Sequence, residues 1–427
     1  MTIRIQGGRV VDPVAGTVKA LDLLIRGECI AAVLPAGTAV DGVPEEGVID
    51  ATGKLVVPGL IDMHVHLREP GQEHKETIAT GALAGVVGGY SALACMPNTD
   101  PVNDCGAVTR FILERARRAG LLRVYPIGAI TLGQKGVNLA DFEDLRSSGA
   151  VAVSDDGRPV EARECMARAM IWACRCGLAV VSHCEDLTLS GSGVLHEGSV
   201  SARLGLKGIP AASEEVAVRR EIDLARETRC PVHIAHVSTA GSVCLIREAK
   251  EEGLPVTAET APHYFTLDHG AVLEYNTSAK MNPPLRTPED VEAVRRGLAE
   301  DVIDVIATDH APHSSLEKDV DFERAAFGII GLETALPLTL ALVEQGFLSL
   351  SQAVRKLSLN PARILGVEGG RLEEGKVADL AMIDMECSYS LDAGDIHSRS
   401  KNSPFLGRAL KGRNVLTMVG GRVVWKR

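Results

Sequence analysis

Two histidines lie one residue apart at the end of an apolar run. His64 and His66 occur in "IDMHVHLREP", directly after "LVVPGL", and Arg68 follows two residues later. Successive side chains of a strand point to opposite faces, so His64 and His66 would point to the same side. Two imidazoles on one face can bind the same divalent ion. The alternative to a metal site, for an isolated His-x-His, is a pair of histidines that is simply packed or hydrogen-bonded.

Other short apolar runs also finish in a polar side chain of a ligand type. In chain order these strand ends are Asn98, Asp156, His183, His236 and Asp309. Imidazole and carboxylate together suit Zn²⁺ or a similar divalent ion. Four histidines and two carboxylates exceed the needs of one tetrahedral ion. They fit two ions that share a carboxylate and a hydroxide, since two close cations make hydroxide available near neutral pH.

The strand end that carries Asp156 offers two adjacent carboxylates, in "SDDG" (154–157). Neighbouring residues point to opposite sides, so one would face the metal site and the other the loop. The alternation does not choose between Asp155 and Asp156.

The remaining histidines are expected to have other places. His233 precedes His236 by three residues and should face the other side of its strand, and His310 should face away from Asp309. His263, in "ETAPHYF", could line the site. We expect the histidines of turn-rich segments at the surface: His74, His196, His269 and His397.

The apolar runs that carry these residues number eight, and helical patterns separate them. Segments such as "AVTRFILERARRAG" repeat apolar residues at three and four, which is helical spacing. Strand–helix units repeated eight times, with continuously apolar strands, indicate an α/β protein with a (β/α)₈ TIM barrel. A doubly wound sheet would usually carry a Gly-rich turn after its first strand, which is not seen. The runs are 55–66, 91–97, 123–130, 150–156, 178–183, 231–236, 255–259 and 302–309.

Both chain ends differ from the middle, because short β-like runs and turns fill them. Neither "IRIQGGRVVDP" near the start nor "VLTMVGGRVVWKR" at the end could build a core alone. We therefore predict that residues 1–57 and 368–427 form one small β-sandwich domain, and that residues 58–367 form the catalytic barrel. Active sites of such barrels lie at the carboxyl ends of the strands, where the candidate ligands stand.

Composition narrows the class of protein. Among 427 residues 45% are hydrophobic and 3% aromatic, which suits a closely packed α/β core. A formal charge of −11 with no basic cluster argues against nucleic acid and anionic membranes as partners. The first residues lack an apolar signal region, and the ten cysteines show no framework spacing, so we expect a reduced, cytoplasmic protein.

Several motifs together resemble the dihydroorotase family, of the bacterial class I type, in the amidohydrolase superfamily. They cover nearly the whole chain, and they narrow the resemblance to this branch, whereas His-x-His alone would indicate only the superfamily. The motifs are "HVHLREPG" (64–71), "MPNT" (96–99), "SDDG", "SHCED" (182–186), "IAHVST" (234–239), "MNPPLR" (281–286) and "TDHAPH" (308–313).

The resemblance implies a role for each candidate residue. His64, His66 and Asp309 would hold one zinc ion, His183 and His236 the other, with Asp156 as the bridge. Many superfamily members bridge their metals with a carbamylated lysine, and no lysine stands at this strand end. The implied substrate-binding residues are Arg68, Asn98 and His313 for a carboxylate, Asn282 for the ring or ureido group, and Phe327 and Gly328 for the ring. Arg68 could alternatively pair with Glu69 or Glu73 at the surface.

The implied reaction is the reversible cyclisation of N-carbamoyl-L-aspartate to (S)-dihydroorotate and water, a step of pyrimidine biosynthesis. A metal-bridging hydroxide would attack the ring carbonyl in the hydrolytic direction, and Asp309 would be the general acid and base. The enzyme alternative is another cyclic-amide hydrolase: a hydantoinase, dihydropyrimidinase or allantoinase. A catalytically silent scaffold is the alternative of another class, but all six metal-ligand candidates are intact. The resemblance also suggests a homodimer and an association with aspartate carbamoyltransferase.

Overall fold

The computed structural model describes residues 2–40 and 42–427. Eight parallel strands form a nearly closed barrel in the order β15-β14-β13-β10-β9-β8-β7-β6. Val65 bridges His310 beyond β15, and the His66 N–H donates to the His310 carbonyl at 2.8 Å, so the first and last strands meet. The predicted fold class is confirmed. The strands are β6 (Leu60–Val65), β7 (Tyr90–Cys95), β8 (Arg123–Gly128), β9 (Ala152–Val153), β10 (Ala179–Ser182), β13 (Val232–Ile234), β14 (Val256–Thr260) and β15 (Val305–Ile306).

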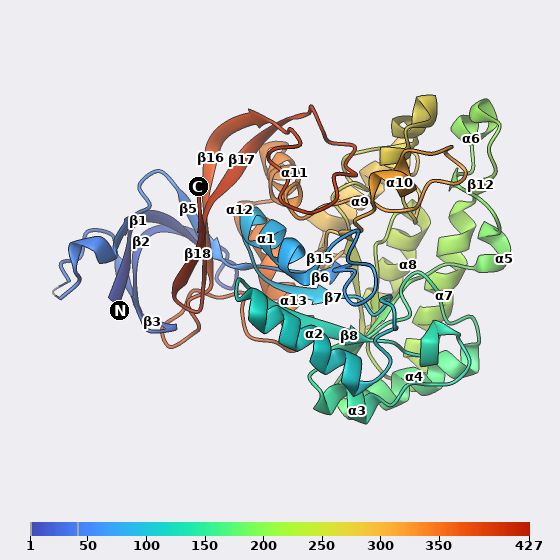
Figure 1. The fold of residues 1–427 in the computed structure, drawn as a ribbon, viewed down its shortest axis with the longest axis horizontal. Helices are drawn as coiled ribbons and strands as arrows, with labels where there is room; N and C mark the ends of the chain where they lie inside the picture. Colours follow the sequence, from blue (N-terminus) through green and yellow to red (C-terminus); the bar gives the residue numbers. More distant parts are fainter. Residues whose placement is uncertain (1, 41) are drawn as a thin grey trace.

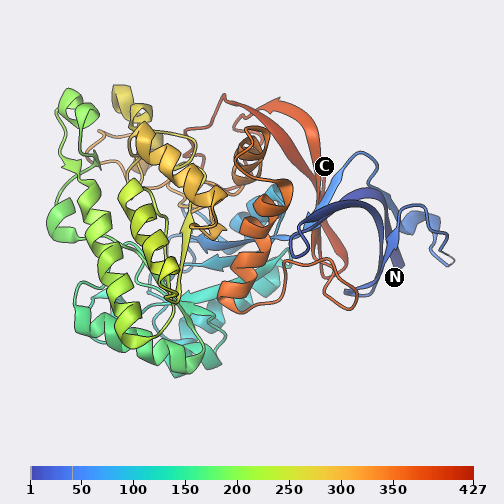
Figure 2. The same ribbon diagram turned by 180° about the vertical axis from the view of Figure 1, so that it is seen from behind.

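Helices cover the outside of this barrel (Figures 1 and 2). In the second of them the buried residues Thr109, Ile112 and Ala116 recur at three and four, so one face packs on the strands while charged residues face solvent. The helices that follow the eight strands are α1 (Ile78–Gly88), α2 (Gly106–Ala119), α3 (Phe142–Ser147), α4 (Arg163–Cys176), α7 (Ala211–Thr228), α8 (Ala240–Glu251), α9 (Pro288–Ala299) and α11 (Ala335–Glu344).

Short elements interrupt this regular order. Lys356 in the π-helical turn Arg355–Leu359 donates to the Ile303 carbonyl, so α12 (Leu350–Val354), this turn and α13 (Asn360–Leu365) lie at the amino-terminal end of β15. The remaining elements follow β8, β10, β14 and β15. They are η2 (Leu132–Gln134), α5 (Leu187–Ser190), β11 (Leu195–His196), α6 (Ser199–Leu204), β12 (Gly208–Ile209), η3 (His269–Tyr275), η4 (Thr277–Ala279) and α10 (Ser315–Lys318).

One predicted strand is wrong. The run 55–66 does not form a single barrel strand, because Gly59 separates β5 (Leu55–Pro58) from β6. A side chain at Gly59 would come within 2.4 Å of the Ser91 hydroxyl, so the chain passes too close to β7 for any larger residue. Strand β5 pairs with β16 and β1 in a different sheet.

Both chain ends form that second sheet, in the order β18-β17-β16-β5-β1-β2-β3, and both termini lie there in Figure 1. A separate apolar core, which includes Ile5, Leu23, Val56, Leu380 and Met418, fills it. The predicted boundaries at residues 57/58 and 367/368 stay predictions. The strands are β1 (Thr2–Asp12), β2 (Thr17–Arg26), β3 (Cys29–Pro35), β4 (Val48–Asp50), β16 (Leu380–Ser390), β17 (Ala409–Val419) and β18 (Arg422–Lys426), and η1 (Glu45–Gly47) precedes β4.

The carboxyl-terminal part of the chain is attached to the barrel at two places. In β17 the Thr417 hydroxyl donates to the Val86 carbonyl of α1 at 2.6 Å. The segment 391–408, between β16 and β17, extends to the carboxyl ends of the barrel strands, where Ser398 binds the Glu76 carboxylate and Asn402 binds the Ala311 carbonyl. This segment therefore belongs spatially to the site. Over the described ranges 2–40 and 42–427, no helix combines the length and apolar character needed to span a membrane.

Candidate active site

Five predicted metal-ligating residues form two groups that share one carboxylate. His64, His66 and Asp156 make one group, and Asp156, His183 and His236 make the other, with the ligand atoms of each group within 4.8 Å of one another. Asp156 Oδ1 lies 3.4 Å from both His64 Nε2 and His183 Nδ1, and Asp156 Oδ2 lies 3.5 Å from His66 Nε2. The structure thus places Asp156, rather than Asp155, between the two groups.

The sixth predicted ligand, Asp309, lies beside the first group. Its Oδ1 is 3.1 Å from His66 Nε2 and 3.6 Å from His64 Nε2. Asp309 and His236 have positive φ angles of 48° and 35°, and they lie three and two residues beyond the ends of β15 and β13. Non-glycine residues rarely adopt this conformation, and such strain concentrates at functional sites. The backbone therefore bends sharply where these two side chains turn towards the barrel axis.

The cluster fits divalent metal ions. His64 Nε2 and Asp156 Oδ1 are buried and, among the described residues, have no hydrogen-bond partner. Buried polar atoms are almost always satisfied, so two orphaned atoms that face each other indicate a missing ligand. Burial raises the pKa of Asp156, but the charges and hydrogen bonds of His64, His183 and His236 outweigh it and hold that pKa well below its usual value. Asp156 is therefore an anionic oxygen donor among imidazoles, which is the donor set that zinc-like ions prefer.

Carboxylates behind the histidines were missed by the sequence analysis. Glu259, in β14, lies 2.5 Å from His64 Nδ1, and Glu185 lies 3.0 Å from His183 Nε2. Such carboxylates fix the tautomer and orientation of a metal-binding imidazole. The available signals were the position of Glu259 at the end of its apolar run and of Glu185 within "SHCED". Asp155 instead binds the Ile130 and Thr131 N–H groups, which is the loop role expected for one of the two aspartates.

The positively charged Arg68 and the adjoining His313 lie beside Asp309 and form a region that we call the cationic corner. Arg68 is buried, and it contacts the Pro312 carbonyl at 3.2 Å and His313 Nε2 at 3.3 Å rather than Glu69 or Glu73. Burial lowers the pKa of Arg68 to about 10, so the guanidinium stays charged at neutral pH. Burial, followed by the charges of Arg68, Lys75 and Lys318, lowers the pKa of His313 to about 2. His313 is consequently neutral, and its Nε2 can accept from Arg68.

The other predicted substrate-binding residues flank the same opening. Asn98 Oδ1 lies 2.8 Å from His66 Nδ1, so Asn98 also orients that imidazole. Asn282 donates to Glu185 at 2.9 Å, which connects it to His183. Gly328 packs against His313 and has a φ of 128°, a conformation that suits glycine. Phe327 is half-buried, with its ring over the Lys280 ammonium.

The remaining histidines mostly follow expectation. His233 and His310 lie outside the two groups, bonded to Glu259 and Glu76 respectively. His74 and His397 are exposed. The surface prediction for His196 is wrong: it is buried, because the Arg286 guanidinium lies 3.2 Å from its Nδ1. His269 is half-buried, its ring 5.7 Å from that of His196.

His263 is buried, with Nε2 unpartnered among the described residues. Burial, with Asp309, His236 and His64 as the charged groups that influence it, lowers its pKa to about 4. This neutral side chain therefore lies near the cluster, which agrees with the expectation that His263 could line the site.

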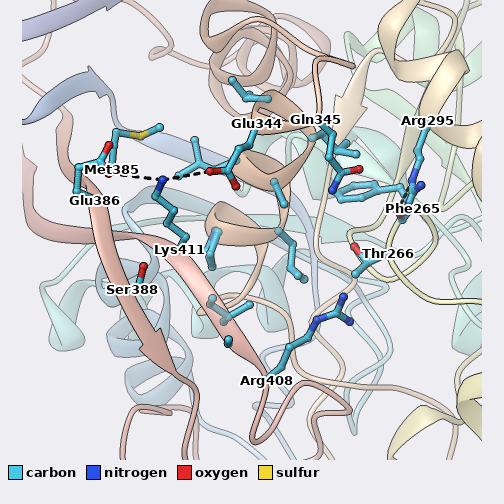
Figure 3. Close-up of a pocket in the computed structure, with 18 residues that line it drawn as sticks. Phe265, Thr266, Arg295, Glu344, Gln345, Met385, Glu386, Ser388, Arg408 and Lys411 are labelled. Carbon is cyan, nitrogen blue, oxygen red and sulfur yellow. Dashed lines mark hydrogen bonds and ion pairs between the residues drawn. The ribbon is translucent and has the colours of Figure 1, made fainter.

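A hollow away from this cluster lies between α11, β16 and β17 (Figure 3). Its volume is about 420 Å³, and Lys411 bridges Glu344 and Glu386 at its edge, at 3.1 Å and 3.5 Å. None of the predicted site residues lines it. The chemistry therefore belongs to the strand ends of the barrel.

An eight-stranded barrel with histidines and aspartates converging at its strand ends defines a metal-dependent hydrolase of the amidohydrolase superfamily. The sequence profile described as "Dihydro-orotase-like" matches residues 53–242, and that described as "Amidohydrolase family" matches residues 202–425. The chain is 57% identical to a dihydroorotase of Pelotomaculum thermopropionicum over 99% of this chain and 98% of that protein. It is 53% identical to a dihydroorotase of Pelobacter propionicus over the full length of both. The chain therefore belongs to the dihydroorotase family, whose members are hydrolases acting on a cyclic amide.

Solved structures show the same architecture at lower identity. An L-hydantoinase from Arthrobacter aurescens aligns with a TM-score of 0.88 and 26% identity, over 99% of this chain and 96% of that one. A dihydropyrimidinase from Brevibacillus agri aligns with a TM-score of 0.87 and 24% identity, over 100% of this chain and 95% of that one. The second likeness concerns the fold alone.

Proposed function

We propose that the protein interconverts N-carbamoyl-L-aspartate and (S)-dihydroorotate plus water, in pyrimidine biosynthesis. The observation that carries this proposal is the buried Arg68, which lies beside Asp309 and His66 without a carboxylate partner of its own among the described residues. A planar guanidinium binds a carboxylate through two parallel hydrogen bonds. Dihydroorotate carries a carboxylate on the cyclic amide, and hydantoin and dihydrouracil do not.

Two zinc ions are the proposed cofactors. His64, His66 and Asp309 would hold one, and His183 and His236 the other, with Asp156 shared between them. When bound, the pair of ions supplies a hydroxide near neutral pH and positive charge for the carbonyl oxygen. Glu259 and Glu185 would keep His64 Nε2 and His183 Nδ1 directed towards the ions.

Asp309 is the proposed general acid and base. Its Oδ1 faces His64 and His66, which leaves Oδ2 to exchange a proton. In hydrolysis Asp309 accepts a proton from the nucleophile and delivers it to the leaving ring nitrogen. In cyclisation it removes a proton from the ureido nitrogen. Burial opposes the charged form of Asp309, but His64, His66 and His236 outweigh it and lower its pKa, so the carboxylate is ready to accept.

The cationic corner would orient the substrate for these steps. Arg68, Asn98 and His313 would bind its carboxylate, and Asn282 the ring or ureido group. Phe327 and Gly328 would border the ring. A substrate held at its carboxylate by Arg68 would have a fixed orientation relative to Asp309, and such fixed orientation contributes much of enzymatic rate enhancement.

Purified protein loaded with zinc should hydrolyse dihydroorotate and leave hydantoin and dihydrouracil largely unchanged. Turnover of hydantoin or dihydrouracil at a rate equal to or above that of dihydroorotate would instead support the other cyclic-amide hydrolases. A homodimer, an association with aspartate carbamoyltransferase and a cytoplasmic location remain predictions of the sequence.

A further inference from the structure

Lys318, the last residue of α10, is a buried cation with an unusual set of partners. Only 5% of its surface is exposed. Its ammonium binds three backbone carbonyls: Lys280 at 3.1 Å, Ala326 at 2.8 Å and Gly328 at 3.0 Å. A neutral amine has two N–H groups and an ammonium has three. Three acceptors at hydrogen-bond distance therefore match the charged form.

Lys280 is a second buried cation in the same part of the barrel mouth, with 1% of its surface exposed. Its ammonium donates to the carbonyls of Phe322 at 2.7 Å and Glu323 at 3.0 Å. It also lies 4.4 Å from the centre of the Phe327 ring, a cation–π distance. Among the described residues, no carboxylate lies within 4 Å of the Lys280 or Lys318 ammonium.

The two lysines adjoin the cationic corner through Gly328. The Gly328 carbonyl accepts from Lys318 and its N–H donates to the Lys280 carbonyl, while a Cβ at this position would lie 3.3 Å from His313 Cδ2. The charge of Lys318 is also one of the causes that lower the pKa of His313. The positive potential of Lys318 therefore extends to the place proposed for the substrate carboxylate.

Neighbouring carboxylates do not cancel this charge. Glu317 is engaged by Lys75 at 2.8 Å, and Glu323 influences Lys280 without forming an ion pair. Asp309 and Asp156 influence Arg68, but Asp156 belongs to both metal-ligand groups and Asp309 lies 3.1 Å from His66 Nε2 of the first group. Arg68, Lys280 and Lys318 thus leave a net positive region at the corner. Buried charges without a counter-ion cost free energy, and a bound anion offsets that cost.

We infer that Lys318, together with Lys280, is a specificity-determining residue: its charge strengthens the binding of cyclic amides that carry a carboxylate over those that lack one. This inference rests on the proposed function, and it adds an electrostatic contribution to the direct contact of Arg68. It also assigns the two lysines a positioning role, because they hold the backbone of residues 322–328 next to His313.

Variants of Lys318 separate charge from hydrogen bonding. Lys318→Gln keeps N–H donors without the charge, Lys318→Met removes both, and Lys318→Arg keeps the charge. We expect the Gln and Met variants to raise KM for dihydroorotate about tenfold, which is the order of effect that the loss of one nearby charge has in a medium of intermediate dielectric constant. We expect kcat to change less than about threefold and Lys318→Arg to restore KM in part. Lys411→Gln, a surface control, should leave both constants unchanged.

Competitive inhibition gives a second readout. Orotate and uracil differ only in the carboxylate, so the inhibition constant of orotate should rise in Lys318→Gln while that of uracil stays constant. A KM for Lys318→Gln within twofold of the unmodified protein would overturn the inference, because hydrogen bonding alone would then suffice. Failure of the unmodified protein to hydrolyse dihydroorotate would instead overturn the proposed function.

If the Lys318 variants do not fold, the unmodified protein still tests the inference through pH. Burial, and then the charge of Lys280, lowers the pKa of Lys318 to about 7, and burial lowers that of Lys280 to about 8 although Glu323 opposes it. Both are charged below these values, so KM for dihydroorotate should rise as pH increases from 6 to 9. The nearby Arg68 stays charged and His313 neutral over this range. A KM independent of pH would overturn the inference.

Discussion

Glu259 accepts a hydrogen bond from His64 Nδ1 at 2.5 Å, although their strands, β14 and β6, are not neighbours in the barrel. Burial raises the pKa of Glu259, but His64 and His233 outweigh it and lower it to about 2, so this carboxylate is ionised at neutral pH. An ionised acceptor at Nδ1 keeps the proton on that nitrogen. His64 Nε2 is then left as a lone-pair donor facing Asp156.

Glu259→Gln should weaken metal binding. The amide is a weaker acceptor, so His64 loses the partner that sets its tautomer, and metal affinity should fall about 10–100-fold. Competition with a chelator of known affinity measures this loss. The exposed Glu344→Gln is the matched control and should bind metal normally. Equal affinity in Glu259→Gln would show that the contact does not tune the metal.

Asp309→Asn should abolish most of the turnover while the protein still folds. The amide cannot accept the proton of the nucleophile, and general acid–base catalysis contributes about 10²–10⁴-fold. Steady-state kcat for dihydroorotate and far-UV circular dichroism together test this expectation. Near-normal turnover with full metal content would refute the assignment of Asp309 as acid and base.

Arg68→Lys should affect binding more than chemistry. A lysine keeps the charge but loses the planar pair of N–H groups, so KM for dihydroorotate should rise about 10–100-fold. Steady-state kinetics should compare the change in KM with the change in kcat. A loss of binding that is equal in the ground state and the transition state raises KM with little change in kcat. Arg117→Lys, at an exposed position of α2, provides the control. An unchanged KM would show that the substrate carboxylate does not bind at Arg68.

Asn402→Asp tests the contact between the carboxyl-terminal segment and the barrel. Asn402 Nδ2 donates to the Ala311 and Gly328 carbonyls, and its Oδ1 accepts from the His313 N–H. An aspartate would place an acceptor against two carbonyls, so the free energy of unfolding should fall by about 2–3 kcal/mol. Denaturant titration measures this loss, and KM should rise because His313 shifts. Asn276→Asp, at an exposed turn, should leave stability nearly unchanged.

Repetition made much of the fold predictable. Eight apolar runs alternated with helical patterns, and all eight contribute a barrel strand. The polar residues at the ends of five of these runs also predicted the six candidate ligands, because parallel strands in a barrel end at one face. The break at Gly59 was missed, since a close approach to Ser91 leaves no periodic trace in the sequence.

The supporting residues were harder to predict. Glu259 and Asn402 act through contacts with residues far away in the chain, whereas Glu185 contacts His183 only two residues before it. The sequence around them does not show which partner each side chain contacts. His196 was placed at the surface because a turn-rich segment carries it, but Arg286 lies 90 residues further along and buries it. Polar residues of this kind depend on tertiary packing, which alternation and spacing do not encode.

The segment 391–408 has a consequence for biosynthesis on the ribosome. All six candidate ligands precede residue 310, but Asn402 makes the hydrogen bonds that hold the His313 N–H and the Gly328 carbonyl in place. A nascent chain could thus assemble its ligand cluster well before the substrate corner is aligned. Substrate binding would therefore require that the chain has been synthesised beyond Asn402. A chain truncated before Asn402 would contain all six candidate ligands but would bind its substrate poorly.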